Sequence, residues 1–242
     1  MKKNHQQQSP RQTGTKPQRL RIDNLLTFDP LTEGQASVYE AWDDGQHIVM
    51  AGTAGTGKTF TAMYLSLEQV LDKGVPGLDK VVIVRSIVPT KEIGFLPGSI
   101  EEKIEPYIAP YKAICTQLFD DPEAYTKLSD NNSIEFISTS FIRGVTISNA
   151  VVIVDEMQNL SFHELDSIIT RLGDNCRVIF CGDYHQSDLT KNHERNGILK
   201  FLEIIDHMNK FEVVTFTWAD IVRSDFVRDY IMTKEYLGVT NE

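Results

Sequence analysis

Short apolar runs alternate along the chain with segments in which apolar residues recur every three to four positions. The runs are rich in Val and Ile with little polar alternation, which is typical of parallel strands covered on both faces. The sequence predicts strands at 47–51, 80–85, 133–138, 150–154, 177–181 and 211–217, and helices at 32–43, 58–72, 99–118, 161–171, 196–208 and 219–236. This order predicts an α/β fold with a doubly wound, mostly parallel sheet and ligands at the carboxyl ends of its strands.

The length of the chain favours one main domain. Its 242 residues, 41% of them hydrophobic, can fill one sizeable core. We assign this single domain to residues 23–242. The segment 86–132 is longer than one strand-to-strand crossover needs, and we expect an insertion there that shapes a substrate surface.

Charge is distributed unevenly between the N-terminus and the rest of the chain. The first 21 residues hold six basic residues and no acidic one, so the formal net charge of −10 leaves −16 for the remainder. Because this head has too few apolar residues to offset the entropy of ordering, we predict a disordered basic tail over 1–22. It is either an arm that contacts nucleic acid or an acidic partner, or a tail that only raises solubility. The acidic remainder argues against a protein that coats duplex DNA broadly.

Three irregularly spaced cysteines, Cys115, Cys176 and Cys181, indicate reduced thiols rather than a disulfide framework or a zinc site. No stretch approaches the roughly 20 apolar residues of a membrane span, and the polar N-terminus does not resemble a signal peptide. We therefore expect a cytoplasmic protein that does not act on membranes.

A phosphate-binding loop is the most informative motif. Residues 52–59 read Gly-Thr-Ala-Gly-Thr-Gly-Lys-Thr, the G-x-x-x-x-G-K-T spacing, between a predicted strand and a predicted helix. Such a loop directs N–H groups at an anion, and the helix adds the positive end of its dipole. Lys58 can reach the β- and γ-phosphates, and the Thr59 hydroxyl can hold Mg²⁺. The predicted nucleotide-binding residues are Thr53, Ala54, Gly55, Thr56, Gly57, Lys58, Thr59 and Phe60.

Two adjacent carboxylates, Asp155 and Glu156, follow the predicted strand 150–154. Asp155 would hold Mg²⁺, directly or through water, and Glu156 would orient and deprotonate the attacking water. A Glu in this place favours hydrolysis over phosphoryl transfer to a substrate, because a water needs a base of its own. The alternative is an ordinary strand that ends in acidic residues, and the phosphate loop upstream argues against it.

The next predicted strand ends in Cys-Gly-Asp-Tyr-His-Gln at 181–186. The neutral amide of Gln186 can hydrogen-bond the terminal phosphate or the water, and so can sense hydrolysis. A solvated loop glutamine is the alternative. His185 is expected to be structural, since this reaction needs no second titrating base.

Several motifs together resemble the PhoH family. They are the phosphate loop, Val-Asp-Glu-Met-Gln-Asn at 154–159, Cys-Gly-Asp-Tyr-His-Gln at 181–186, Asp-Ile-Val-Arg-Ser at 220–224, Gly-Phe-Leu-Pro-Gly-Ser-Ile-Glu-Glu-Lys-Ile at 94–104, Phe-Ile-Arg-Gly at 141–144 and Thr-Arg-Leu-Gly at 170–173. The chain resembles a stand-alone or phage-type member, which in the second case would act in the host cytoplasm.

The resemblance implies a RecA-like P-loop NTPase with motifs similar to those of superfamily 1 helicases. It implies Mg²⁺-dependent ATP hydrolysis coupled to binding, translocation or unwinding of single-stranded RNA or DNA, and a ring-like hexamer. Gln35 matches the glutamine that superfamily 1 proteins place near the adenine, where one end of the amide can accept a hydrogen bond from N6 and the other end can donate one to N7. A polar position on the first helix is the alternative. Ser224 stands where the family often has His, which leaves the role of that neighbourhood open.

Charge that develops on the γ-phosphoryl oxygens requires a guanidinium. Arg171 ends the helix after the carboxylates and is expected to face a neighbouring subunit, Arg223 is expected to act within the chain, and Arg195 is a third choice. Each of them can instead form a surface ion pair. Two-domain helicases carry a second arginine set on a second domain, which this sequence lacks. We therefore predict a homo-oligomer, and specifically a hexamer.

A groove for single-stranded nucleic acid is predicted from Arg85, Lys91, Phe95 and Arg143, because basic groups beside an aromatic ring suit single strands. A packed Phe95 among solvated basic residues is the alternative. Three function classes compete: an ATPase or helicase stimulated by nucleic acid, a P-loop kinase of a small molecule, and a nucleotide-gated binding module. A kinase would not need Glu156.

Overall fold

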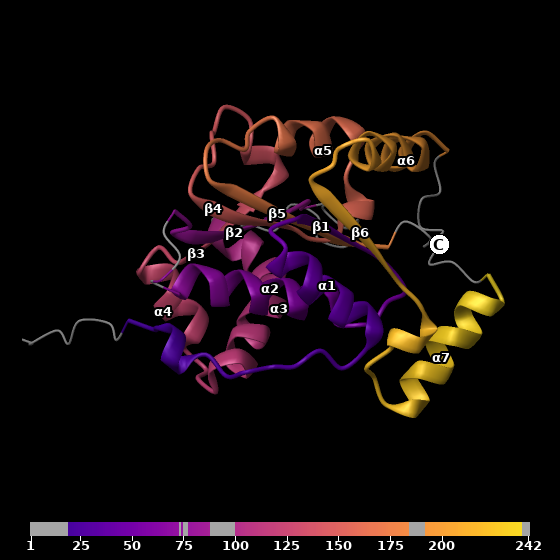
Figure 1. Cartoon of the computed structure of the whole chain (residues 1–242), viewed down its shortest axis with the longest axis horizontal. Helices are drawn as coiled ribbons and strands as arrows, with labels where there is room; N and C mark the ends of the chain where they lie inside the picture. The colour runs from indigo at the N-terminus through magenta and orange to yellow at the C-terminus, as the bar shows by residue number, and fades with distance from the viewer. Residues whose placement is uncertain (1–18, 73, 75–76, 88–99, 184–191, 239–242) are drawn as a thin grey trace, which may run out of the picture.

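The computed structural model describes residues 19–72, 74, 77–87, 100–183 and 192–238. Within these residues, the chain forms a six-stranded sheet whose neighbouring strands are all parallel. The strands are β1 (His47–Gly52), β2 (Lys80–Arg85), β3 (Ile134–Ser138), β4 (Ala150–Val154), β5 (Cys176–Gly182) and β6 (Phe211–Phe216). They lie in the order β3-β2-β4-β5-β1-β6. The predicted parallel sheet is therefore confirmed (Figure 1).

Helices cover both faces of the sheet (Figure 1). One face carries α1 (Glu33–Asp43), α2 (Lys58–Leu71), α3 (Ile100–Phe119) and α4 (Ala124–Asp130), and the other carries α5 (Phe162–Ile169) and α6 (Asn192–Asp206). Successive strand residues alternate between two cores, so that Ile48 and Met50 face α1 and α2 while Val49 and Ala51 face α5 and α6. Burial on both faces is the reason why the four inner strands β2, β4, β5 and β1 are continuous apolar runs, whereas the edge strands β3 and β6 are partly exposed.

The segment predicted as an insertion forms the crossover from β2 to β3. Its helices α3 and α4 pack on the same face as α2, and Tyr111, Cys115 and Leu118 are buried there. The short α4 was not predicted. The part of this segment that the structure describes thus belongs to the main core, and residues 88–99 lie outside the description.

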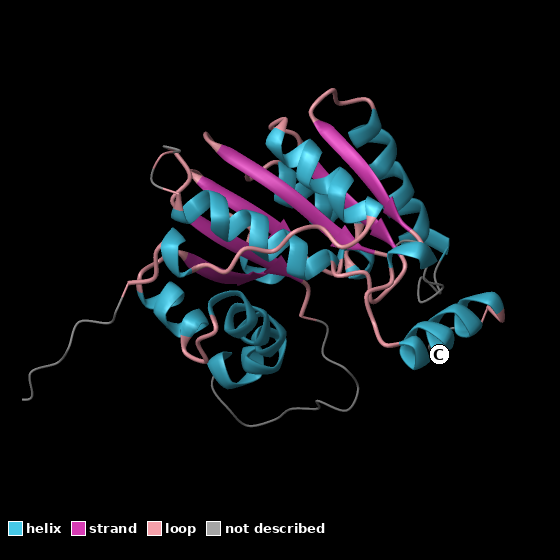
Figure 2. Ribbon diagram, turned by 60° about the horizontal axis from the view of Figure 1, so that its bottom comes forward, coloured by secondary structure: helices cyan, strands magenta, loops and turns pink. Residues whose placement is uncertain are grey.

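The chain after β6 differs from the predicted continuous helix at 219–236. A short 3₁₀ turn (Trp218–Asp220) is followed by a break, and α7 (Asp225–Tyr236) begins only after Ser224. The buried carboxylate of Asp220 accepts hydrogen bonds from the N–H groups of Thr217 and Gly34, which fixes the turn against α1. No residue of α7 is fully buried, and the helix projects from the body of the molecule (Figure 2).

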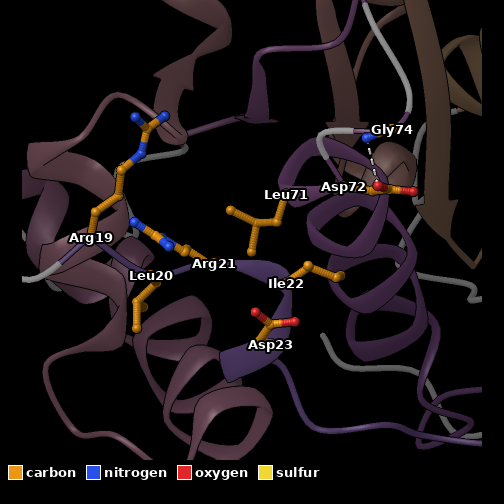
Figure 3. Close-up of a pocket in the computed structure, with 8 residues that line it drawn as sticks. All are labelled: Arg19, Leu20, Arg21, Ile22, Asp23, Leu71, Asp72 and Gly74. Atoms are coloured by element: carbon orange, nitrogen blue, oxygen red, sulfur yellow. Dashed lines mark hydrogen bonds between the residues drawn. The ribbon is translucent and has the colours of Figure 1, made fainter.

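The predicted disordered tail falls mostly on residues 1–18, which lie outside the described part of the chain. Leu20 is buried against the core, and a 3₁₀ turn follows at Ile22–Asn24. Residues 19–23 border a cavity of about 450 Å³ together with Leu71, Asp72 and Gly74 (Figure 3). This cavity lies at the end of α2 that is remote from the phosphate loop. Among the residues described, no helix is both long and apolar enough to cross a bilayer.

Candidate nucleotide-binding site

The phosphate loop joins β1 to α2 in the predicted strand–loop–helix arrangement. Gly57 lies in the left-handed region, with φ of 82°, directly before α2 begins at Lys58. A Cβ at Gly52 would clash with the carbonyl oxygen of Phe216 on β6, so only glycine fits there. The free N–H groups of the first helical turn can therefore face an anion held by the loop.

The Lys58 ammonium is held by the loop itself. It donates to the carbonyl oxygens of Gly52 and Thr53, at 2.8 and 2.7 Å, and to the Thr56 hydroxyl at 3.3 Å. Burial lowers the pKa of Lys58, and nearby carboxylates, of which Asp183 contributes most, act in the opposite direction. A confined ammonium beside inward N–H groups is suited to bind phosphates.

Asp155 meets the phosphate loop at Thr59, whose hydroxyl donates to Oδ1 of Asp155 at 3.0 Å. The two segments do not lie on adjacent strands, because β5 lies between β1 and β4. The two oxygens suit Mg²⁺, which takes one or two protein ligands and leaves the others to phosphates and water. Within the described residues, no group of three or more His, Cys, Asp and Glu side chains could hold a metal ion on its own. The site therefore fits a metal bound together with a nucleotide.

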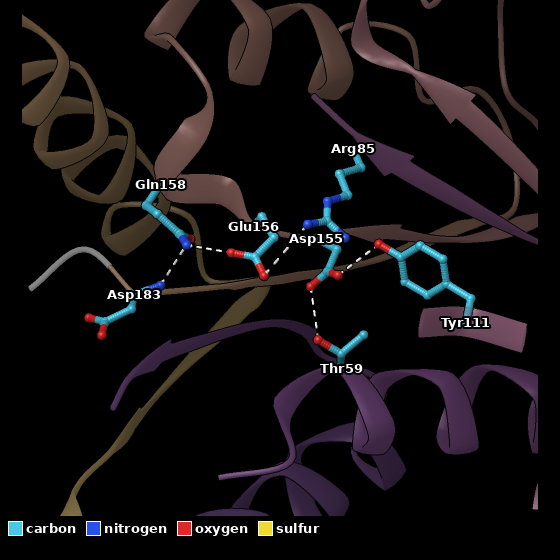
Figure 4. Close-up of polar contacts among 7 residues, drawn as sticks. All are labelled: Thr59, Arg85, Tyr111, Asp155, Glu156, Gln158 and Asp183. Carbon is cyan, nitrogen blue, oxygen red and sulfur yellow. Dashed lines mark hydrogen bonds and ion pairs between the residues drawn. The ribbon is translucent and has the colours of Figure 1, made fainter. Parts of the chain in front are cut away.

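Glu156 has left-handed backbone angles, with φ of 54° and ψ of 46°. Such strain in a residue other than glycine costs on the order of 1–3 kcal/mol and is found mainly at functional sites. The Glu156 carboxylate accepts a hydrogen bond from Nε2 of Gln158, whose Oε1 accepts from the N–H of Asp183 at 3.1 Å (Figure 4). The end of β5 thus orients Glu156 through Gln158. Gln158 lies within the motif 154–159, but the sequence pattern predicted no role for it.

Two further residues reach the carboxylates from β2 and α3. The Tyr111 hydroxyl donates to Oδ2 of Asp155 at 2.7 Å, and the Arg85 guanidinium lies 4.0 Å from Oε1 of Glu156 (Figure 4). Burial raises the pKa of Tyr111 and the Asp155 carboxylate raises it further, so the hydroxyl stays a donor. Tyr111 has no local sequence signal, because tertiary packing of α3 brings it to the site.

Arg85 was predicted in a nucleic-acid groove, and the structure brings it to the carboxylates of Asp155 and Glu156. The strand register explains this position. Val84 on β2 pairs with Val154 on β4, so the residues that follow meet at the carboxyl edge of the sheet. The sequence shows that Arg85 and Asp155 each follow an apolar run, but only the strand order shows that these two runs are neighbours.

A cleft of about 770 Å³ opens beside the phosphate loop. Its lining includes residues 54–61, both carboxylates, and Phe28, Leu31, Gln35 and Tyr39. The Gln35 amide donates to the carbonyl of Thr56 at 3.0 Å and accepts from the N–H of Leu31 at 2.8 Å. It therefore fastens the loop to α1, and its contact with adenine stays a prediction. Thr53 is buried, and its carbonyl oxygen anchors Lys58.

The arginines that were predicted to act on the phosphates lie in different parts of the fold. Arg223 lines the cleft, and the N–H of Val222 donates to the carbonyl of Gly55 at 3.1 Å. Arg171 follows α5, and its carbonyl accepts from the N–H of Ile147, which precedes β4. Arg171 thus lies at the amino edge of the sheet, opposite the cleft of its own chain. The side chain of Arg195, and all of Lys91, Phe95, His185 and Gln186, lie outside the described residues.

Comparison with known protein families shows to which family the chain belongs. The family model described as PhoH-like protein matches residues 27–235. The chain belongs to the PhoH family. A PhoH-like protein of Mycobacterium leprae is 33% identical over 218 residues, which cover 88% of this chain and 61% of that protein. Protein PhoH of Escherichia coli K12 is 34% identical over 194 residues, which cover 79% of this chain and 54% of that protein. The chain thus spans about three-fifths or less of the length of these PhoH relatives.

Solved structures show a weaker similarity. The large terminase of a thermophilic bacteriophage matches with a TM-score of 0.47 and 13% identity, over 84% of this chain and 50% of the terminase. The Pif1 helicase of Candida albicans matches with a TM-score of 0.39 and 16% identity, over 87% of this chain and 44% of the helicase. PhoH membership, the parallel sheet and the phosphate loop after β1 together define a RecA-like, nucleotide-binding ATPase fold, as predicted.

Proposed function

We propose that this PhoH-family chain hydrolyses ATP with Mg²⁺ as cofactor, and that single-stranded RNA or DNA stimulates the reaction. The observation that carries the proposal is the 3.0 Å contact between Thr59 and Asp155, with Glu156 lining the same cleft. A hydroxyl and a carboxylate suited to Mg²⁺ thus lie beside a second carboxylate suited to activate water.

Each residue of the site then has a distinct task. The N–H groups of the loop and the Lys58 ammonium bind the β- and γ-phosphates, and Thr59 and Asp155 hold Mg²⁺. A metal ion held by these two residues would supply positive charge beside the phosphate oxygens. Glu156 accepts a proton from the attacking water, and Arg223 at the cleft compensates charge that develops during bond cleavage.

Nucleic-acid stimulation is supported by the surface next to the catalytic carboxylates. β3 pairs with β2 so that Ser138 lies opposite Arg85, and the chain continues into the motif at 141–144. Phe141 is 56% exposed, and Arg143 is exposed as well. Exposed aromatic rings and guanidinium groups are the side chains on which the bases and phosphates of single strands bind.

Assembly with further copies of the chain, as a hexamer, is part of the proposal. Arg171 lies away from its own cleft, whereas α7 begins next to Arg223 at the cleft. α7 exposes a face that includes Phe226 and Tyr230, which are 82% and 64% exposed. A second copy of the chain that covers this face would bury exposed apolar area beside the cleft.

Steady-state ATP hydrolysis, measured with and without single-stranded RNA or DNA, tests the proposal. Glu156→Gln should lower kcat by about 10²- to 10⁴-fold with little loss of ATP affinity, because an amide cannot accept the proton of water. Lys58→Ala should instead weaken ATP binding itself. Normal turnover of Glu156→Gln would contradict the assignment of the base. ATP binding without turnover would favour a nucleotide-gated module, and turnover only with a small-molecule acceptor would favour a kinase.

A further inference from the structure

Arg85 approaches Glu156 from outside the nucleotide cleft. Among the described residues, Asp155 and Glu156 line the cleft, and Arg85 does not. Figure 4 shows Arg85 on the opposite side of the two carboxylates from Thr59. Its side chain is 22% exposed. Glu156 therefore lies between the nucleotide cleft on one side and the Arg85 guanidinium on the other.

The contact between the Arg85 guanidinium and the Glu156 carboxylate is long enough to be exchanged. Its distance of 4.0 Å from the Glu156 carboxylate exceeds the roughly 2.7–2.9 Å of a charge-assisted hydrogen bond. The guanidinium also lies 5.9 Å from the centroid of the Tyr107 ring, within the range of cation–π attraction. Burial would lower the pKa of Arg85, but Tyr111 and the two carboxylates raise it, so the guanidinium stays charged. Several separate attractions hold Arg85, so an incoming anion with better geometry can replace the one to Glu156.

The edge of the sheet beside Arg85 has groups suited to a single-stranded polyanion. Ser138 pairs with Arg85, and the exposed Phe141 and Arg143 follow a few residues later in the chain. A single strand whose bases stacked on Phe141 could present its phosphates to guanidinium groups at this edge. A phosphate can accept two parallel hydrogen bonds from an arginine. The Glu156 carboxylate, at 4.0 Å from the Arg85 guanidinium, is too far away to accept such bonds.

We propose that Arg85 is a positioning residue that restrains Glu156 until a phosphate of single-stranded nucleic acid binds its guanidinium. Before that exchange, Arg85 and Gln158 share the Glu156 carboxylate, and Arg85 draws it away from water in the cleft. After the exchange, Gln158 alone orients the carboxylate, and Glu156 is free to accept the proton. The inference rests on the proposed function and adds the step by which the polymer stimulates hydrolysis.

ATP hydrolysis by Arg85→Gln, without and with oligouridine or oligothymidine, tests the restraint. Without nucleic acid, the rate should rise about two- to fivefold, the size of effect expected from a partly exposed ion pair. Added oligonucleotide should then stimulate the variant much less than the wild type. Tyr107→Leu, which removes the ring beside the guanidinium, should give a smaller rise in the same direction. A misfolded variant would lose activity, so a rise is not explained by damage to the fold.

Two controls separate the restraint from other effects. The double variant Arg85→Gln, Glu156→Gln should be inactive, because the gain passes through Glu156. Lys80→Gln removes a cation from the other end of β2, where Lys80 pairs with Glu135 at 2.7 Å, and should leave both rates unchanged.

The possible outcomes distinguish the restraint from the proposed function. A rate of Arg85→Gln at or below that of the wild type overturns the restraint. Wild-type hydrolysis that neither oligonucleotide stimulates overturns the coupling to nucleic acid and the release step, while the unstimulated rate of Arg85→Gln still decides the restraint. Equal stimulation by heparin would show that any polyanion releases Arg85, and would overturn the assignment to nucleic acid. If the wild type and Arg85→Gln both lack turnover, the proposed function and the restraint fail together.

Discussion

Glu156 depends on a chain of three hydrogen-bonded groups for its orientation. The N–H of Asp183 positions Gln158, and Gln158 donates to the Glu156 carboxylate. The strained backbone at Glu156 gives this side chain a defined direction, and the amide of Gln158 keeps it there. A positioned base accounts for a large part of the rate in such reactions, because small displacements from the reactive geometry are costly.

Gln158→Leu removes both hydrogen bonds while it keeps a similar volume. We expect kcat for ATP to fall about 10- to 100-fold, as a misplaced catalytic group predicts. Binding of a fluorescent ATP analogue should be largely retained, since Lys58 and the loop are unchanged. Asn159→Ala is the matched control, because Asn159 lies in the same short turn and is exposed. An unchanged kcat in Gln158→Leu would show that Glu156 needs no such support.

The predicted residues that the structure brings together come from segments at the carboxyl edge of the sheet. Lys58, Thr59, Asp155 and Glu156 follow buried apolar runs, and parallel strands bring their carboxyl ends to one edge, so the meeting of Thr59 with Asp155 was predictable. The contact of Tyr111 with Asp155 was not, since it depends on how α3 packs over the sheet.

At the scale of elements, the strands match the sequence analysis more closely than the helices do. Each strand end lies within one residue of its prediction. For the four inner strands the reason is that a strand buried on both faces begins and ends with its apolar run. α6 begins at Asn192 instead of 196, and α7 begins at Asp225 instead of 219. The second difference has a long-range cause: the Asp220 carboxylate contacts Gly34 on α1, which a local pattern does not reveal.

Asp220→Asn tests how much this buried carboxylate contributes to stability. Burial would raise its pKa, but hydrogen bonds from Thr217, Thr32 and Gly34 outweigh burial and hold the pKa of Asp220 below its ordinary value. We expect the variant to lose about 1–3 kcal/mol of unfolding free energy at neutral pH, because a charged acceptor is replaced. A depressed pKa stabilises the fold above the unfolded value of about 3.9, and this contribution is lost as the pH falls through the folded pKa.

Urea unfolding over a pH series measures this difference between Asp220→Asn and the wild type. The difference in unfolding free energy should be constant above about pH 5 and should shrink at lower pH. Asp229→Asn, an exposed position on α7, is the matched control and should leave the unfolding free energy nearly unchanged. A difference between Asp220→Asn and the wild type that does not depend on pH would mean that shape, and not charge, stabilises the turn.

At the scale of the whole molecule, the segment that leads into α7 lines the cleft. The linker before this helix contacts the phosphate loop through Val222 and Gly55, and Arg223 lines the cleft. α7 itself contributes little to the core and exposes Phe226, Tyr230, Tyr236 and Leu237. A helix that touches the nucleotide site with one face and exposes aromatic rings on another can link ATP binding to contact with a second copy.

The double variant Phe226→Ser, Tyr230→Ser tests whether a second copy covers α7. The variant should have the mass of a single chain in solution by light scattering, whereas the wild type should form a larger assembly, because the substitutions remove the apolar area that association would bury. Its ATP hydrolysis should fall as well, since Arg171 of a neighbouring copy would no longer be brought near the cleft. Leu199→Ser, at a 46% exposed position on α6, is the matched control and should keep the mass and activity of the wild type. An assembly that persists in the double variant would place the contact between copies elsewhere, and a wild type with the mass of one chain would leave Arg223 as the arginine that completes the site.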